Sequence, residues 1–132
     1  LQWITPYSNP KDDAILIKKA IDILNTDKRK KVLLTHYQFL STVLDEDLNI
    51  FNRWYLWSND SHPTETHKYF DFYKKMINKN IKQNNVEVIY LLGQKNEIIF
   101  KNLKNYFIEI CFKNTTLVEN KFSYHEIIEC SK

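Results

Sequence analysis

The chain has 132 residues and a mass of 16.0 kDa, a length typical of one domain, and 43% of its residues are hydrophobic and 14% aromatic. This content is sufficient for a packed core, so a disordered chain is not the expected state. The formal net charge of +3 comes from 19 basic and 16 acidic residues spread along the chain, with no basic stripe interleaved with aromatic residues, and we expect no nucleic-acid partner.

The first half of the chain predicts two helices and two strands. A helix is predicted over 10–26, because Asn9 can cap it and a proline occupies its first position. The apolar run Lys31 to Tyr37 predicts a buried parallel strand, and 38–44 can begin a short helix. The aromatic run Arg53 to Trp57 predicts a second strand, since large aromatic side chains suit a half-buried sheet surface.

A long helix is predicted over 65–83, with Thr64 as its N-cap. Its large apolar residues recur at spacings of three and four, which predicts that they face inward and that the lysines between them face solvent. These apolar residues are Tyr69, Phe72, Tyr73, Met76 and Ile77.

The remaining elements complete an α/β pattern. Val86 to Leu92 predicts a strand, 95–105 a helix, and Phe107 to Phe112 and Tyr124 to Cys130 two further strands, with a turn at 113–116. Alternation of helices and strands predicts a single α/β domain, a three-layer sandwich with a mostly parallel, Rossmann-like sheet of 4–5 strands flanked by helices on both faces.

The only glycine, Gly93, limits the possible ligand sites. Loops that bring phosphate groups close to the backbone need several glycines, so a P-loop and a Rossmann GxGxxG motif are both excluded. Neither serine at 41 or 58 lies in a GxSxG motif. We therefore assign no catalytic residue and no cofactor.

A binding edge is predicted where the first two strands end. Ligands of open α/β sheets bind beyond the carboxyl ends of the strands, and polar and aromatic side chains follow both predicted strands. Trp57 can display an aromatic face for sugar stacking, whereas His62 and His67 are five residues apart and do not share a helix face, which argues against a metal site. The candidate binding residues are His36, Tyr37, Arg53, Trp57, Asp60 and His62.

Cys111 and Cys130 are the only cysteines. In an oxidising compartment they can close a loop of about twenty residues, and in the cytosol they would remain two buried thiols. The residues alone leave both possibilities open.

Several segments together carry a family resemblance. They are the lead-in QWITPY, the strand KVLLTHYQFLS, the NRWY element, the His-Pro before the aromatic helix, VEVIYLLG and the C-terminal cysteine pair. In this order they resemble the soluble C-terminal domain of bacterial polytopic membrane proteins similar to the dolichyl-phosphate-mannose protein mannosyltransferase class.

The resemblance implies a location, a partner and a role. It implies a domain on the extracytoplasmic, periplasmic face of the membrane, in which Cys111 and Cys130 form a disulfide and residues 1–10 join it to a membrane domain of the same polypeptide. It also implies a non-catalytic role in binding or orienting a carbohydrate, a lipid-linked sugar or an acceptor for a glycosyltransferase.

Two other functions remain open. The first is a free-standing cytosolic α/β transferase or hydrolase that acts on a small sugar or phosphorylated substrate, with His36 as its base. The second is a scaffold that binds proteins through its basic helices. Whether the domain is an enzyme is thus left undecided.

Overall fold

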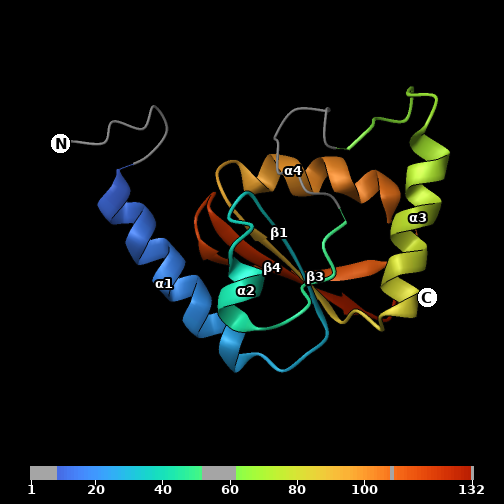
Figure 1. The fold of residues 1–132 in the computed structure, drawn as a ribbon. Helices are drawn as coiled ribbons and strands as arrows, with labels where there is room; N and C mark the ends of the chain where they lie inside the picture. Colours follow the sequence, from blue (N-terminus) through green and yellow to red (C-terminus); the bar gives the residue numbers. More distant parts are fainter. Residues whose placement is uncertain (1–8, 52–61, 108, 132) are drawn as a thin grey trace.

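The protein is described from a computed structural model, which places residues 9–51, 62–107 and 109–131. Within these ranges the fold is mixed α/β, with one four-stranded open sheet and helices packed against it (Figure 1). In chain order the elements are α1 (Pro10–Thr26), β1 (Lys31–Thr35), α2 (Leu40–Leu44), α3 (Phe70–Gln83), β2 (Val88–Leu92), α4 (Asn96–Leu103), the 3₁₀ helix η1 (Lys104–Tyr106), β3 (Cys111–Val118) and β4 (Phe122–Ile128).

The sheet has the strand order β1-β2-β4-β3, and only its first pair is parallel. β2 pairs antiparallel with β4, and β4 antiparallel with β3. The prediction of a mostly parallel sheet is therefore wrong, and the three-layer Rossmann-like arrangement is not confirmed. The physical reason is that β3 and β4 follow one another without a helix between them, and strands joined by a tight turn can only pair antiparallel.

The two C-terminal strands have different bounds from those predicted. β3 begins and ends later in the sequence than the predicted strand over 107–112, and β4 begins and ends two residues earlier than the predicted strand over 124–130. β3 runs through the polar residues that were expected to form a turn, and the chain instead reverses at 119–121, where Asn120 has a positive φ of 57° and the Lys121 amide bonds to the Val118 carbonyl. Asparagine tolerates this left-handed conformation better than most residues. The hairpin therefore turns on Asn120.

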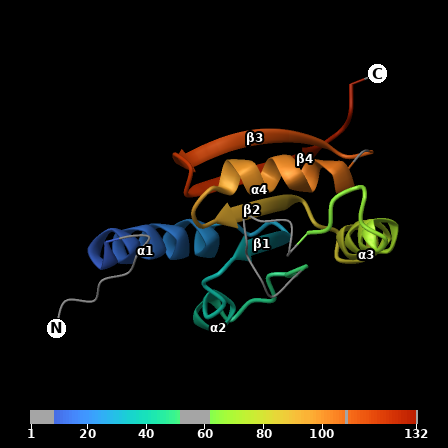
Figure 2. The ribbon, with the colours of Figure 1, turned by 90° about the horizontal axis from the view of Figure 1, so that it is seen from above.

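Side chains alternate between the two faces of the sheet and fill two separate clusters. Leu33 of β1 belongs to one cluster, which contains residues of α1 and α2, whereas Val32 and Leu34 belong to the other, with residues of α3 and α4. Figures 1 and 2 both show α1 and α3 on opposite sides of β1. We refer to these as the α1/α2 face and the α3/α4 face.

Helix α1 has the predicted bounds, because the Asn9 side chain accepts a hydrogen bond from the Lys11 amide and Pro10 occupies the first turn. Helix α3 starts five residues later than predicted. The His67 amide bonds to the Thr64 carbonyl and the Phe70 amide to the His67 carbonyl, so this segment forms turns and leaves the helix to begin at Phe70.

The inward face of α3 also differs from the prediction. Phe70, Ile77 and Ile81 are buried, whereas Tyr69, Phe72 and Met76 are exposed. In the described part of the chain, no helix combines the length and the hydropathy that crossing a bilayer requires.

Cys111 and Cys130 form a disulfide, with their Cα atoms 5.2 Å apart. Cys111 begins β3, and Cys130 lies two residues beyond the end of β4, so the bond closes the open end of the hairpin. A loop of 19 residues corresponds to a stabilisation of about 3 kcal/mol in the chain-entropy model. The pairing expected from the family resemblance is present.

Candidate functional site

The end of β1 is a tight, hydrogen-bonded turn that displays aromatic side chains. The Thr35 hydroxyl accepts a bond from the Tyr37 amide at 3.1 Å, and the Gln38 side-chain amide donates to the Thr35 carbonyl at 2.5 Å. The Leu40 amide bonds back to the Tyr37 carbonyl and leads into α2. Because Thr35 is buried within the strand, these bonds fix the direction of the side chains that follow it.

Three rings and one carboxylate meet at this turn. The rings of His36 and Tyr37 have centroids 3.9 Å apart, and those of Tyr37 and Phe39 are 6.2 Å apart in an edge-on arrangement. The Asp13 carboxylate, from the first turn of α1, lies close enough to the Tyr37 hydroxyl to raise its pKa through charge and hydrogen bonding. We call these four residues, Asp13, His36, Tyr37 and Phe39, the β1 edge.

The electrostatics of the β1 edge favour neutral rings beside a charged carboxylate. Partial burial lowers the pKa of His36, and the nearby Asp13 carboxylate opposes this shift without cancelling it. Partial burial raises the pKa of Tyr37, and Asp13 raises it further through its charge and hydrogen bond. At neutral pH the edge therefore holds a neutral imidazole and a protonated phenol.

Only part of the predicted binding set can be located. His36 and Tyr37 lie together at the β1 edge, whereas Arg53, Trp57 and Asp60 fall outside the described residues, as does the predicted strand over 53–57. His62 is described, and it is buried between the rings of Tyr73 and Tyr106, whose centroids are 6.1 and 6.4 Å from its own.

His62 lies on the α3/α4 face, while Tyr37 packs on the α1/α2 face, so the structure does not bring the two together. Burial lowers the pKa of His62 to about 4. Among the described residues, its Nε2 atom has no hydrogen-bond partner. A neutral, buried ring in an aromatic cluster acts as part of the core.

A second buried histidine, His125, contacts a serine on one side and an asparagine on the other, as the histidine of a hydrolase triad contacts its serine and its acid or amide. His125 Nε2 lies 3.2 Å from the Ser123 hydroxyl, and its Nδ1 lies 2.8 Å from the Asn114 side-chain oxygen. A nucleophile must be reachable by substrate, yet Ser123 and His125 are each only 5% exposed.

Helix α4 covers this group. The Phe100 ring stacks on the His125 imidazole at 3.5 Å, and Asn96 donates a hydrogen bond to the Ser123 hydroxyl at 2.9 Å. A substrate would have to displace α4 to reach the serine. The group therefore pairs the Ser123 hydroxyl and both His125 ring nitrogens between α4 and the sheet, although the Asn96 side-chain oxygen has no hydrogen-bond partner among the described residues. It is no hydrolase site.

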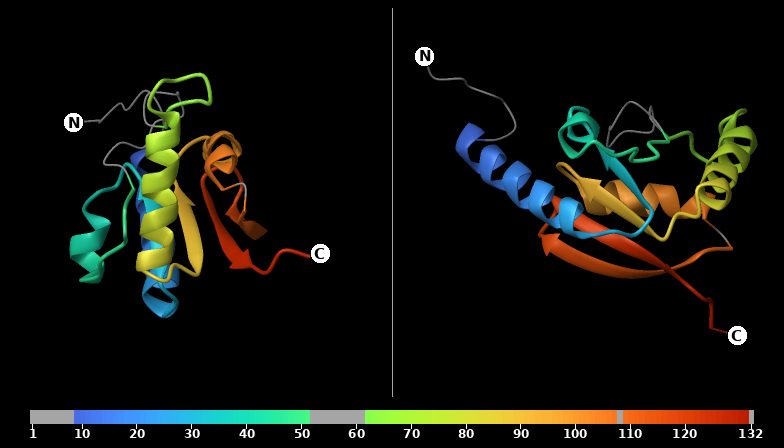
Figure 3. Two further views of the ribbon diagram at one scale, coloured as in Figure 1. Left: turned by 90° about the vertical axis from the view of Figure 1, so that its right-hand side faces the viewer. Right: turned by 60° about the horizontal axis from the view of Figure 1, so that its bottom comes forward.

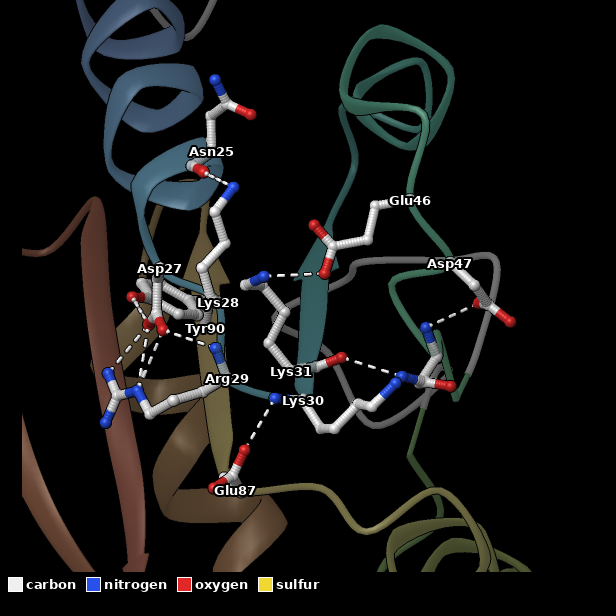
Figure 4. A network of polar contacts seen from close by, with 11 residues as sticks. Asn25, Asp27, Lys28, Arg29, Lys30, Lys31, Glu46, Asp47, Glu87 and Tyr90 are labelled. Atoms are coloured by element: carbon white, nitrogen blue, oxygen red, sulfur yellow. Dashed lines mark hydrogen bonds and ion pairs between the residues drawn. The ribbon is translucent and has the colours of Figure 1, made fainter.

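A third polar group surrounds the start of β1, at the end of the strand away from His36 (Figure 4). Asp27 accepts hydrogen bonds from Arg29 and from the Tyr90 hydroxyl, and Arg29 also pairs with Glu126 at 2.7 Å. Lys31 pairs with Glu46 at 2.7 Å. Each charge of this group has an oppositely charged partner within the protein, with Arg29 shared by two carboxylates, so we assign the group a structural role.

A surface pocket beside α3 combines lysines with carboxylates. Its amide, Asn78, is already bonded to the carbonyls of Lys74 and Tyr106. The pocket-lining residues are Asp71, Lys74, Lys75, Asn78, Tyr106 and Glu109. Because both signs of charge are present, the pocket favours no one class of ion. No cluster of three potential metal-ligating side chains occurs in the described ranges.

The β1 edge is thus the described group best suited to a polar organic ligand. Aromatic faces pack on the apolar face of a sugar ring, and a carboxylate accepts hydrogen bonds from hydroxyl groups. Two of its members, Asp13 and Phe39, were not predicted. Asp13 lies in the first turn of α1, and only the packing of α1 beside β1 brings it to Tyr37.

Comparison of the chain with protein-family models, with curated proteins and with solved structures finds no match.

Proposed function

We propose that this chain is a non-catalytic, extracytoplasmic domain of a membrane-bound glycosyltransferase-like protein, in which it helps to bind or orient a sugar or an acceptor. The observation that carries the proposal is the β1 edge, where an exposed Phe39 ring, two further rings and the Asp13 carboxylate share one turn. The partner would be the membrane domain of the same polypeptide, and the ligand a carbohydrate or a lipid-linked sugar.

The disulfide supports the location. Disulfides persist in oxidising compartments and are rare in the cytosol, so Cys111–Cys130 favours an extracytoplasmic face, the periplasm in a bacterium, over the free-standing cytosolic enzyme. The burial of the Ser123–His125 pair supports a non-catalytic role, since it removes the one nucleophile–base pair found in the described residues.

An NMR titration of the isotope-labelled chain tests the proposal. The ligands are neutral oligosaccharides and a short-chain isoprenyl phosphohexose, the latter as a water-soluble lipid-linked sugar. We expect millimolar binding, with chemical-shift changes centred on His36, Tyr37 and Phe39. Phe39→Ala should weaken binding about fivefold, because one stacking ring is lost.

The matched control is Tyr69→Ala, which removes a ring of similar exposure, 55% against 49% for Phe39, from the residue that precedes α3. This variant should bind the sugar like the unmodified chain. The proposal is contradicted if no sugar shifts these resonances or if Phe39→Ala binds equally well. Turnover of a sugar substrate that is abolished by His36→Ala would instead establish an enzyme.

A further inference from the structure

Helix α3 carries a second apolar face that points away from the core. Phe72 is 69% exposed, Tyr69 55% and Met76 38%. These residues are separated by three and four positions, so they form one continuous stripe that runs from Tyr69, just before α3, into the second turn of the helix. We call them the α3 stripe.

The core does not need the α3 stripe. Phe70, Ile77 and Ile81, on the opposite side of the helix, already fill the cluster beneath α3. Figure 3 (left) shows α3 in front of the sheet, with its outer side facing the viewer. Three large apolar side chains are therefore presented together on one outward surface.

Positive charge borders the stripe. Residues 68–83 contain five lysines and a single acid, Asp71. The Lys68 ammonium lies 4.8 Å from the centroid of the Tyr69 ring, and Lys75 and Lys79 each follow a stripe residue by three positions. The five lysines are Lys68, Lys74, Lys75, Lys79 and Lys82, of which Lys74 lies four positions after the buried Phe70 and therefore on the inner side of the helix.

An apolar stripe edged by lysines matches the surface of an anionic bilayer. Phenylalanine and methionine side chains can enter the boundary between headgroups and acyl chains, tyrosine suits the headgroup level, and lysines bind the lipid phosphates. A second copy of the chain fits poorly, because packing two α3 stripes together would bring their lysines into mutual repulsion.

We propose that the α3 stripe docks this protein on an anionic lipid surface, with Phe72 and Met76 inserted and the bordering lysines on the phosphates. The proposal is independent of sugar binding at the β1 edge. It also explains why α3 retains a large exposed ring at Phe72, a residue whose helical spacing had predicted an inward position.

Vesicle flotation measures this binding. The 132-residue chain is mixed with vesicles of phosphatidylcholine alone or with phosphatidylglycerol added, at low and at high salt. We expect binding to the anionic vesicles that weakens with salt, and about tenfold weaker partition for Phe72→Ser, because the largest inserted apolar side chain is removed. Lys75→Glu combined with Lys79→Glu should reduce partition at least as much.

The chain offers a matched control in Ile15→Ser, which removes a side chain that is 68% exposed on α1. Its partition should equal that of the unmodified chain. All of these changes are at exposed positions, so we expect each variant to fold. Circular dichroism and thermal unfolding check this.

Three results would overturn the proposal. The first is failure of the unmodified chain to float with anionic vesicles. The second is equal partition of Phe72→Ser and the unmodified chain. The third is self-association, or binding to a single-stranded oligonucleotide, that requires Phe72 while no vesicle is bound, because the stripe would then serve another partner.

Discussion

The two faces of the sheet differ in how their ionisable side chains are accommodated. On the α1/α2 face, Asp27 pairs with Arg29 at 2.8 Å and Lys31 pairs with Glu46 at 2.7 Å. On the α3/α4 face, His62 and His125 are buried among aromatic rings, and burial lowers the pKa of each to about 4. One face is stabilised by matched charges and the other by neutral rings.

Because of this difference, we expect the two faces to lose stability at different pH values. Burial raises the pKa of Asp27, but hydrogen bonds from Arg29 and Tyr90 outweigh burial and hold the pKa well below its ordinary value of 3.8. The histidines instead disfavour their protonated form in the folded state. Mild acid should therefore act first on the α3/α4 face, and stronger acid on the α1/α2 face.

The largest predicted effect is a loss of stability in mild acid. An unfolded histidine binds a proton near pH 6.5, whereas folded His62 and His125 bind one only near pH 4, so between these values the unfolded state binds more protons. The free energy of unfolding should fall as the pH falls through this window, by about 3 kcal/mol for each histidine. Denaturant unfolding at a series of pH values measures the slope.

Substitution of each histidine shows how much of the pH dependence of the unfolding free energy it causes. His62→Gln and His125→Gln should each remove about half of the pH dependence between 6.5 and 4. His67→Gln, which changes an exposed histidine just before α3, serves as the control for replacing a histidine that is not buried. A double variant that unfolds with the original slope would show that the buried histidines do not cause the acid sensitivity.

Asp27→Asn should have the next largest effect. It replaces a carboxylate that accepts hydrogen bonds from Arg29 at 3.0 Å and from the Tyr90 hydroxyl at 2.6 Å. Because the folded pKa of Asp27 is lowered, its contribution is present above pH 3.8 and is lost as the pH falls below that value. We expect a loss of about 2 kcal/mol at pH 7, measured by denaturant unfolding, since charge-assisted bonds contribute about this much.

The control for Asp27→Asn is Asp22→Asn, at an exposed position on α1. It should change the free energy of unfolding by less than about 0.5 kcal/mol. Equal effects of the two substitutions would show that the Asp27 network contributes no more than an ordinary surface acid.

The helices and buried strands could be predicted from the sequence where a local signal was strong. The Asn9 cap and the following proline defined α1, and the continuous apolar run before Gly93 defined β2. β3 could not be found in this way. It is an edge strand whose residues Lys113, Asn114 and Thr116 are exposed, so its composition is that of a turn.

The sites depended on contacts between distant segments. Asp13 joins Tyr37 only because α1 packs beside the end of β1. Asn114 joins His125 only through the register of the antiparallel β3–β4 pair, in a segment that was expected to be a turn. In α3, the periodicity of large residues was read correctly as helical. The same spacing, however, is compatible with an apolar stripe that faces either the core or the solvent. In the structure, Phe70 and Ile77 are the residues of α3 that pack in the core.

Lys31→Met should have the smallest effect, although Lys31 is only 1% exposed. The substitution removes a buried ammonium at little change of volume, and Glu46, whose side chain is 37% exposed, can be hydrated once its partner is gone. The segment after α2 also stays attached, because Asn49 bonds to the Lys31 carbonyl and the Leu33 amide bonds to the Leu48 carbonyl.

We therefore expect Lys31→Met to change the free energy of unfolding by less than about 1 kcal/mol, as measured by denaturant unfolding. Lys30→Met, at the exposed neighbouring position, is the control for adding a methionine to this strand entry. A loss above about 3 kcal/mol for Lys31→Met alone would mean that this ion pair stabilises the fold as a buried network does. A near-neutral result would show that two charged residues of the α1/α2 face contribute differently to the free energy of unfolding. Asp27 would stabilise the fold through several hydrogen bonds, whereas the Lys31–Glu46 ion pair would only offset the cost of burying the Lys31 ammonium.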